Sequence, residues 1–199
     1  NRLPREVRVL DADRMERRAG PRAAPSRLDT AHASRQSVVM SADEDVAKIV
    51  GRAAARRSTA ERIVAAHSDN PQALSDACIL FALSGDDAQA LAMARRAAAL
   101  APNNADFAYN LAVSLEHAGD ADGAIAAHHR AVALAPGNAR YHYALVRIEK
   151  QTPTTNRIPK LEALIAQTDS AAQSHAGHAL AKTYEDFGDL PQSFAWLTK

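Results

Sequence analysis

Two histidine pairs and one cysteine are the residues of this chain best suited to chemistry. His128 and His129 are adjacent, and His175 and His178 are spaced i, i+3, which places them on one face of a helix. Imidazole is a common zinc ligand, but no cysteine or carboxylate cluster accompanies either pair to complete a tetrahedral shell. We therefore expect packing histidines and no metal site. Cys78 has no predicted basic neighbour, so we expect a packing thiol rather than a nucleophile.

The glycines do not form a phosphate-binding loop. Neither G-x-x-x-x-G-K-[ST] nor G-x-G-x-x-G occurs in the sequence, and the glycines of its second half stand singly. The sequence therefore predicts no catalytic residue and no cofactor-binding residue, and we expect this stretch of chain to be catalytically silent.

Composition narrows the class of protein. The 199 residues are 47% apolar, 24% charged and only 5% aromatic, with a formal net charge of +1. A net charge close to zero gives no sign of the basic surface that nucleic-acid binding needs. No apolar run reaches the roughly 18 to 20 residues that cross a bilayer. A single cysteine cannot form an intramolecular disulfide, so we expect a reducing, cytoplasmic location. Abundant alanine favours closely packed helices over sheets.

The two ends of the chain differ from its middle. Residues 1–39 lack a 3.6-residue apolar period and contain several prolines, so we expect a disordered or non-native leader, with Met40 as the native start. Ser41 can then cap the first helix. The last helix begins near Leu190 and has no C-cap glycine, so we expect a chain truncated inside a helix.

An internal repeat with an offset of 34 residues organises the middle. Gly85-Asp86 recurs as Gly119-Asp120, and Asn104 recurs as Asn138. Each unit has the pattern of a helix, a tight Gly-Asp turn and a second helix, with helices expected at 71–83, 87–101, 105–118 and 121–135. A lone hairpin leaves one face uncovered, so the units are expected to stack into an all-α solenoid.

Flanking segments extend the repeat in both directions. Helices at 43–57 and 59–67, the second with a Ser58 and Glu61 capping box, are expected to form an N-terminal cap over residues 40–70. The repeats of residues 71–199 then divide into four units, at 71–104, 105–138, 139–169 and 170–199. The third is divergent, because residues 151–156 replace the Gly-Asp turn between helices expected at 139–150 and 157–167. The fourth is truncated.

The spacing within the units resembles the tetratricopeptide repeat. That family has a bulky residue at repeat position 4, Leu at 7, a small residue at 8, an aromatic or bulky residue at 11, Ala at 20, an aromatic residue at 24, Ala at 27 and Pro at 32. The matching residues are Leu74, Cys78, Phe81, Ala90, Ala97 and Pro102 in one unit, and Leu111, Ala112, Leu115, Ala124, Ala131 and Pro136 in the next. Ala77, Ala94, Ala108 and His128 depart from the pattern. The resemblance implies a right-handed superhelix of helical hairpins that binds proteins or peptides.

Residues 141–199 further resemble the repeat region of bacterial tetratricopeptide-sulfotransferase proteins. The similarity lies in Tyr143-Ala-Leu-Val-Arg-Ile, in Asn156-Arg-Ile-Pro-Lys-Leu-Glu-Ala-Leu-Ile and in His178-Ala-Leu-Ala-Lys-Thr-Tyr-Glu-Asp-Phe-Gly-Asp. In that family the repeats precede a sulfotransferase domain. The resemblance thus implies a domain beyond Lys199 that uses 3′-phosphoadenylyl sulfate and contacts the repeats. The alternative is a free-standing adaptor without catalytic activity.

The same fold implies a groove lined by the first helix of each repeat. The predicted peptide-binding residues are Tyr109, Asn110, Val113, Glu116, His117, Arg140, Tyr143, Arg147 and Lys150. Arg140, Arg147 and Lys150 would form a basic strip suited to an acidic peptide or a C-terminal carboxylate, and the alternative is a solvated charged face. The carboxylate clamp of chaperone-binding family members is matched only by Asn110 and Arg147. We expect a protein or peptide partner, no nucleic acid and no membrane.

Overall fold

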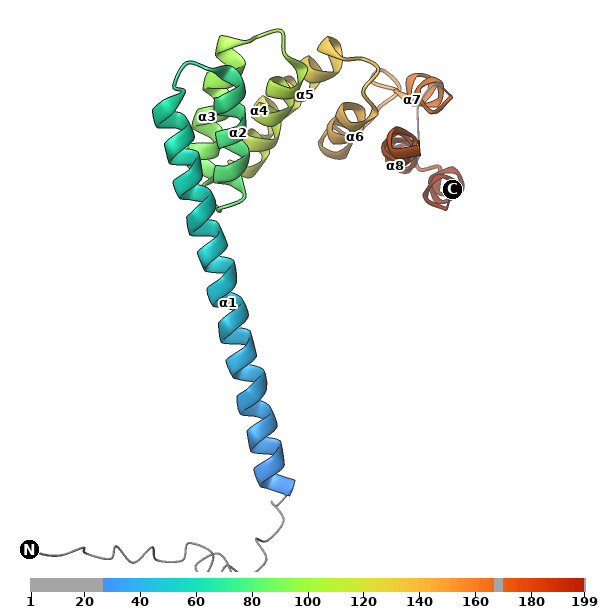
Figure 1. Ribbon diagram of the computed structural model, residues 1–199. Helices are drawn as coiled ribbons and strands as arrows, with labels where there is room; N and C mark the ends of the chain where they lie inside the picture. The colour runs from blue at the N-terminus through green and yellow to red at the C-terminus, as the bar shows by residue number, and fades with distance from the viewer. Residues whose placement is uncertain (1–26, 167–169, 199) are drawn as a thin grey trace, which may run out of the picture. The chain divides into compact units, whose positions relative to one another are not determined.

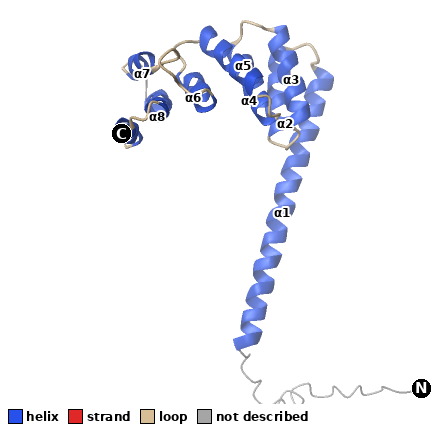
Figure 2. Cartoon of the chain, turned by 180° about the vertical axis from the view of Figure 1, so that it is seen from behind, coloured by secondary structure: helices blue, strands red, loops and turns tan. Residues whose placement is uncertain are grey.

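The computed structural model describes residues 27–166 and 170–198, with side chains for residues 46–166 and 173–198. Every regular element in these ranges is an α-helix (Figure 2). The chain divides into two compact units, Asn1–Lys48 and Ile49–Lys199, and the second holds all the repeats. No helix within the described ranges combines the length and the apolarity needed to span a bilayer.

Four helices confirm the two regular repeats. The helices expected at 71–83, 87–101, 105–118 and 121–135 are α2 (Pro71–Ala82), α3 (Asp87–Leu100), α4 (Ala105–His117) and α5 (Ala121–Leu134). Within each repeat the two helices pack against each other, and α3 also packs against α4, so the hairpins stack (Figure 1). The all-α solenoid expected from the sequence is confirmed.

The Gly-Asp turns join the two helices of a repeat by the same chemistry each time. Gly85 and Gly119 both have φ +79°, a left-handed conformation that only glycine adopts without steric cost. The following aspartate donates its backbone N–H to a carbonyl five residues earlier, as from Asp120 to Leu115 at 3.0 Å. Its side chain then caps the second helix, and Asp120 Oδ1 accepts from Gly123 N at 2.9 Å.

Asparagine residues cap the N-termini of the first helices of the repeats. Asn70, Asn104 and Asn138, each 34 residues apart, are the N-caps of α2, α4 and α6 (Ala139–Ile148). The side chain of Asn104 accepts hydrogen bonds from Asp106 N at 2.9 Å and Phe107 N at 3.2 Å. These caps satisfy amides that a helix start leaves free, so each repeat restarts in the same register.

Small residues make up much of the core between the helices. Ala90, Ala94 and Ala97 of α3 are buried with Leu74 and Cys78 of α2 in one cluster, and the next repeat forms further clusters of the same kind. Alanine carries no long side chain to separate the helices, so their axes can approach closely.

The predicted helix pair at 43–57 and 59–67 is wrong. α1 (Arg27–Ala66) is a single helix, because no glycine or proline interrupts residues 52–66. Thr59 Oγ1 donates to the Ala55 carbonyl at 2.9 Å, the bond of a helix-interior threonine rather than of a cap. Residues 27–39 of the expected leader are helical as well, and residues 1–26 lie outside the described part of the chain.

The third unit departs from the hairpin form. Its helices α6 and α7 (Ile158–Ile165) occur where expected, but each packs mainly on α8 (Ser170–Asp186) and little on the other. The loop between them is tied to α8, since Gln151 N donates to Asp186 Oδ2 at 2.8 Å. α9 (Leu190–Leu197) follows the Gly188-Asp189 turn as the second helix of the fourth unit, which the sequence predicts to be truncated.

Gly119→Ala tests the turn geometry. A Cβ at φ +79° is strained, so we expect the free energy of unfolding to fall by about 1 to 2 kcal/mol. Urea unfolding followed by circular dichroism measures this change. Gly137→Ala is the matched control, because Gly137 is not among the positive-φ glycines of the described residues and an added Cβ there meets nothing within 4 Å. Equal losses for the two variants would contradict this account of the turn.

Candidate peptide-binding surface

The predicted surface lies on the first helices of successive repeats. Contacts link these helices in chain order, from α2 to α4, from α4 to α6 and from α6 to α8. Side chains on one stripe of each helix therefore form a continuous series, and all of them belong to the unit Ile49–Lys199. The predicted residues fall into several local groups within it.

Two tyrosines and an arginine form the first group, between α4 and α6. The rings of Tyr109 and Tyr141 stack with centroids 5.3 Å apart and an interplanar angle of 28°. Arg140 Cζ lies 4.3 Å from the centroid of Tyr109, which is a cation–π contact. Tyr141 OH donates to Asp106 Oδ1 at 2.5 Å, and Arg140 Nη2 lies 3.8 Å from the same oxygen. The Arg140 guanidinium thus lies against the aromatic pair.

Glu116 is the centre of the second group. Its Oε1 atom lies 2.7 Å from Nε2 of His128, and its Oε2 atom lies 2.5 Å from Nη2 of Arg147. His128 is fully buried on α5 and meets the edge of the Tyr109 ring at 5.7 Å. One carboxylate therefore joins α4, α5 and α6, and the aromatic and charged groups touch through Tyr109.

Burial shifts two pKa values in these groups. It raises the pKa of Tyr141 to about 12, with a further contribution from the hydrogen bond to Asp106, so Tyr141 stays a protonated donor. Burial lowers the pKa of His128, and the hydrogen bond and charge of Glu116 oppose that shift only in part. Neutral His128 then donates its Nε2 hydrogen to Glu116.

Asn110 and His117 lie on α4 but face other helices. Asn110 Nδ2 donates to Ser75 Oγ on α2 at 2.8 Å, so this amide helps to hold neighbouring repeats together. His117 Nδ1 lies 3.5 Å from Asp87 Oδ1 at the start of α3, and both side chains are about half exposed. The structure does not bring His117 into either group.

The remaining predicted residues lie toward the C-terminal repeats. The Tyr143 ring faces His175 and His178 of α8, with centroid distances of 6.1 and 5.9 Å. Val113 is half-buried on α4, and Lys150 is exposed just beyond the end of α6.

The predicted basic strip has a more balanced charge than its sequence suggests. Arg140 has Asp106 beside it and Arg147 has Glu116, both contributed by the preceding repeat. Sequence reasoning missed the buried Tyr141 and the exposed Asp106, whose hydrogen bond holds the first group together. Their spacing of 35 residues, close to the repeat length, is the signal that could have paired them.

Among the residues suited to chemistry, His128 and Cys78 are buried, whereas His129 and His178 are exposed. His128 and His129 bond to different carboxylates, Glu116 and Glu149, at 2.7 and 2.8 Å. Within the described residues no group of three or more His, Cys, Asp or Glu side chains is placed to hold a metal ion. Cys78 is buried, which raises the pKa of its thiol, and Sγ lies 3.5 Å from Ser114 Oγ.

Comparison with known proteins supports the fold. Residues 81–148 match the tetratricopeptide repeat family model. A crystal structure of MamA is similar with a TM-score of 0.55 and 18% identity, covering 70% of this chain and 81% of that one. The crystal structure of YrrB, described as a TPR protein with an unusual peptide-binding site, has a TM-score of 0.54 and 16% identity, covering 82% and 88%. No curated protein matches the sequence. The described part of the chain therefore has the fold of an all-α tetratricopeptide superhelix.

Two buried histidines predict a loss of stability in mild acid. Burial lowers the pKa of both His128 and His142, whereas histidine in an unfolded chain titrates near about 6.5. The unfolded state therefore binds protons first, and the free energy of unfolding should fall as the pH drops from about 7 to 5. Leu74 stands at the equivalent position two repeats earlier, so leucine suits this site. His142→Leu should therefore reduce the fall in stability. Urea midpoints at several pH values measure it.

His67→Gln is the control for this pH effect, because His67 is exposed beyond the end of α1. Its pH profile should overlay that of the unsubstituted protein. A His142→Leu profile with the original slope would show that burial of this histidine does not govern the acid sensitivity.

Proposed function

We propose that this tetratricopeptide-repeat scaffold binds an acidic peptide across the first helices α4 and α6. The observation that carries the proposal is the Arg140 guanidinium, which is half exposed and held 4.3 Å above the Tyr109 ring. A cation fixed in this way loses little conformational freedom when it binds a carboxylate. Tyr109, which is only partly buried, supplies rigid apolar surface for the neighbouring part of a peptide, and the buried Tyr141 ring stacks on it.

The two arginines differ in how readily a ligand can engage them. Arg140 lies 3.8 Å from Asp106, whose side chain is 69% exposed, and a long exposed ion pair of this kind contributes little to stability. A ligand carboxylate can replace Asp106 at small cost. Arg147 is bound closely by Glu116, whose side chain is only 17% exposed and is also held by His128. Arg140 is therefore the principal recognition residue and Arg147 the secondary one.

We further infer that these repeats are the N-terminal scaffold of a longer, sulfotransferase-like protein that uses 3′-phosphoadenylyl sulfate. The sulfotransferase assignment rests on the sequence resemblance of residues 141–199. A further packed segment is supported by an apolar stripe on α9 and the turn before it, formed by Phe187, Leu190, Phe194 and Leu197, which are 36%, 63%, 69% and 59% exposed. Counted from the aspartate that caps its helix, Leu197 occupies the same position as His128 in α5 and Ala94 in α3. Both of those residues are buried. An equivalent burial of Leu197 requires a further helix packed on α9.

Reversing the charge of Arg140 tests the peptide site. Arg140→Glu should weaken binding of an acidic peptide by about tenfold or more, because it removes a charge-assisted hydrogen bond. Titration calorimetry with a poly-glutamate peptide and a matched poly-glutamine peptide measures this change. Arg95→Glu is the control, since Arg95 is an exposed arginine on α3, outside the proposed site. Equal weakening by both variants would mean that net charge alone drives binding.

Phe194→Asp tests the scaffold proposal in the natural full-length protein. If a following helix covers Phe194, the variant should lower the free energy of unfolding by about 1.5 to 3 kcal/mol in the full-length protein and by much less in residues 1–199. Gln192→Asp, an exposed change on the same helix, is the control. Sulfate transfer from 3′-phosphoadenylyl sulfate by the full-length protein tests the activity. A protein that ends shortly after Lys199 and lacks transfer would be the adaptor instead.

A further inference from the structure

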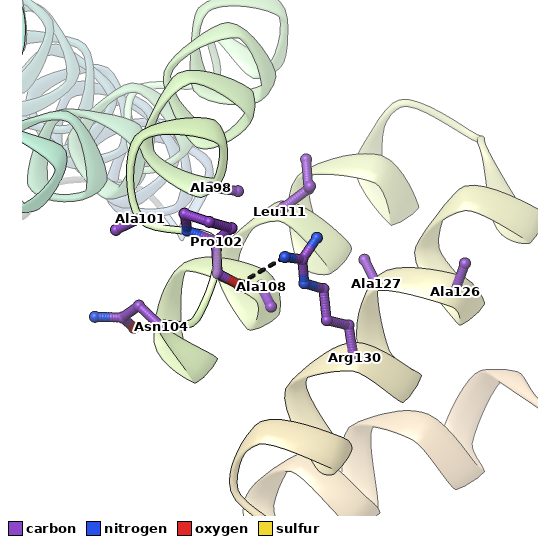
Figure 3. A pocket seen from close by; sticks show the side chains of 9 residues that line it. All are labelled: Ala98, Ala101, Pro102, Asn104, Ala108, Leu111, Ala126, Ala127 and Arg130. Atoms are coloured by element: carbon purple, nitrogen blue, oxygen red, sulfur yellow. Dashed lines mark hydrogen bonds between the residues drawn. The ribbon is translucent and has the colours of Figure 1, made fainter.

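A hollow lies between the second helices α3 and α5, on a stripe of α4 different from the one that carries Tyr109. It has a volume of about 210 Å³. Its lining is mostly apolar, with alanines from three helices, and Arg130 reaches across its mouth (Figure 3). Arg130 Nη2 donates to the Pro102 carbonyl at 2.7 Å, which fixes the guanidinium at this edge. An enclosed apolar cavity of about 150 Å³ suffices to hold a benzene molecule, so this space is large enough for a side chain.

The hollow exists because the second repeat lacks side-chain atoms that the first repeat has. Alignment by 34 residues pairs Ala127 with Met93, Ala98 with Val64 and Ala108 with Leu74. All three alanines line the hollow. Leu111 is larger than its equivalent Ala77 and forms one wall. An open space also borders Met93, but it differs in place from the hollow, because it lies next to Arg57, Glu61 and Gln89.

The first repeat shows which chemical group occupies the equivalent position. Arg96, the equivalent of Arg130, donates through Nη2 to the Ser68 carbonyl at 2.6 Å, matching the bond from Arg130 to Pro102. Its Nη1 atom lies 3.9 Å from Met93 Sδ. Arg130 is held in the same way, but alanine at position 127 leaves no sulfur beside it. Met93 thus lies beside Arg96 where Ala127 leaves space beside Arg130, although Met93 and Val64 still border an open space of about 270 Å³.

We propose that this hollow receives the methionine side chain of a partner polypeptide. Methionine is unbranched and polarizable, which suits an irregular apolar space, and its sulfur would meet Arg130 as Met93 meets Arg96. Because Arg130 is exposed, its other donors favour a partner with a carboxylate next to that methionine. This site is independent of the peptide surface on α4 and α6, so either can fail alone.

Titration with a short peptide tests the assignment. The probe is acetyl-Gly-Asp-Met-Gly-amide labelled with ¹³C at the methionine methyl, and it is compared with the same peptide carrying alanine or norleucine in place of methionine. The methionine peptide should bind at least tenfold more tightly than the alanine peptide. Tighter binding of methionine than of norleucine is expected from the sulfur contact. Equal binding by the alanine peptide, or by the norleucine peptide, would overturn the assignment to methionine.

Substitutions within the chain supply the controls. Ala127→Met fills the hollow from inside and should weaken peptide binding at least tenfold, whereas Ala133→Met, on an exposed position of the same helix, should not. Ala98→Val is a second filling variant should Ala127→Met fail to fold. Unchanged binding by a folded filling variant would overturn the proposal.

Discussion

The rest of the structure depends on burial of a hairpin face that only the next repeat can cover. Contacts between first helices show how closely this burial is tied to the repeat length. Asn110 bonds to Ser75, and Tyr141 bonds to Asp106, each across 35 residues. Because the regular repeats restart at an asparagine cap and turn at a left-handed glycine, successive first helices meet with this offset at both junctions, although the bonded side chains stand at different repeat positions. A shift of one residue would rotate each helix by about 100° and remove these contacts.

This periodic stacking also determines the chemistry of the candidate surface. A first helix presents one stripe to its neighbours, so residues from successive repeats approach each other whatever their charge. Glu116 meets His128 within its own repeat and Arg147 from the next. Arg140 meets the aromatic rings and Asp106 from the preceding repeat. Arg140 and Arg147 of this surface thus carry paired charges, and in the proposed function a ligand would bind by exchange with the weaker pair, that of Arg140 and Asp106.

The helices of the repeats could be predicted because turn and capping residues lie next to the helices they end or begin. The contacts of the candidate surface could not, because they join residues of different repeats. The Gly-Asp turns and the asparagine positions define the helices α2 to α5 to within a residue, because capping depends on neighbours in the sequence. The break expected at Ser58 was wrong, since a capping-box pattern in an alanine-rich segment is also compatible with a continuous helix. The pairing of Arg147 with Glu116 spans 31 residues and depends on the displacement between repeats, which no local pattern encodes.

Alanine content explains both the close packing and its local failure. Where alanine lies between helices, the axes approach and the residue is buried, as at Ala94 and Ala124. The helices cannot approach further where the backbone is already held by a capped turn and by the Arg130 bond to Pro102. An alanine such as Ala127 in place of a larger residue then leaves a space instead of a closer contact. Repeats that share one backbone register can therefore differ in what they bind through single changes of side-chain volume.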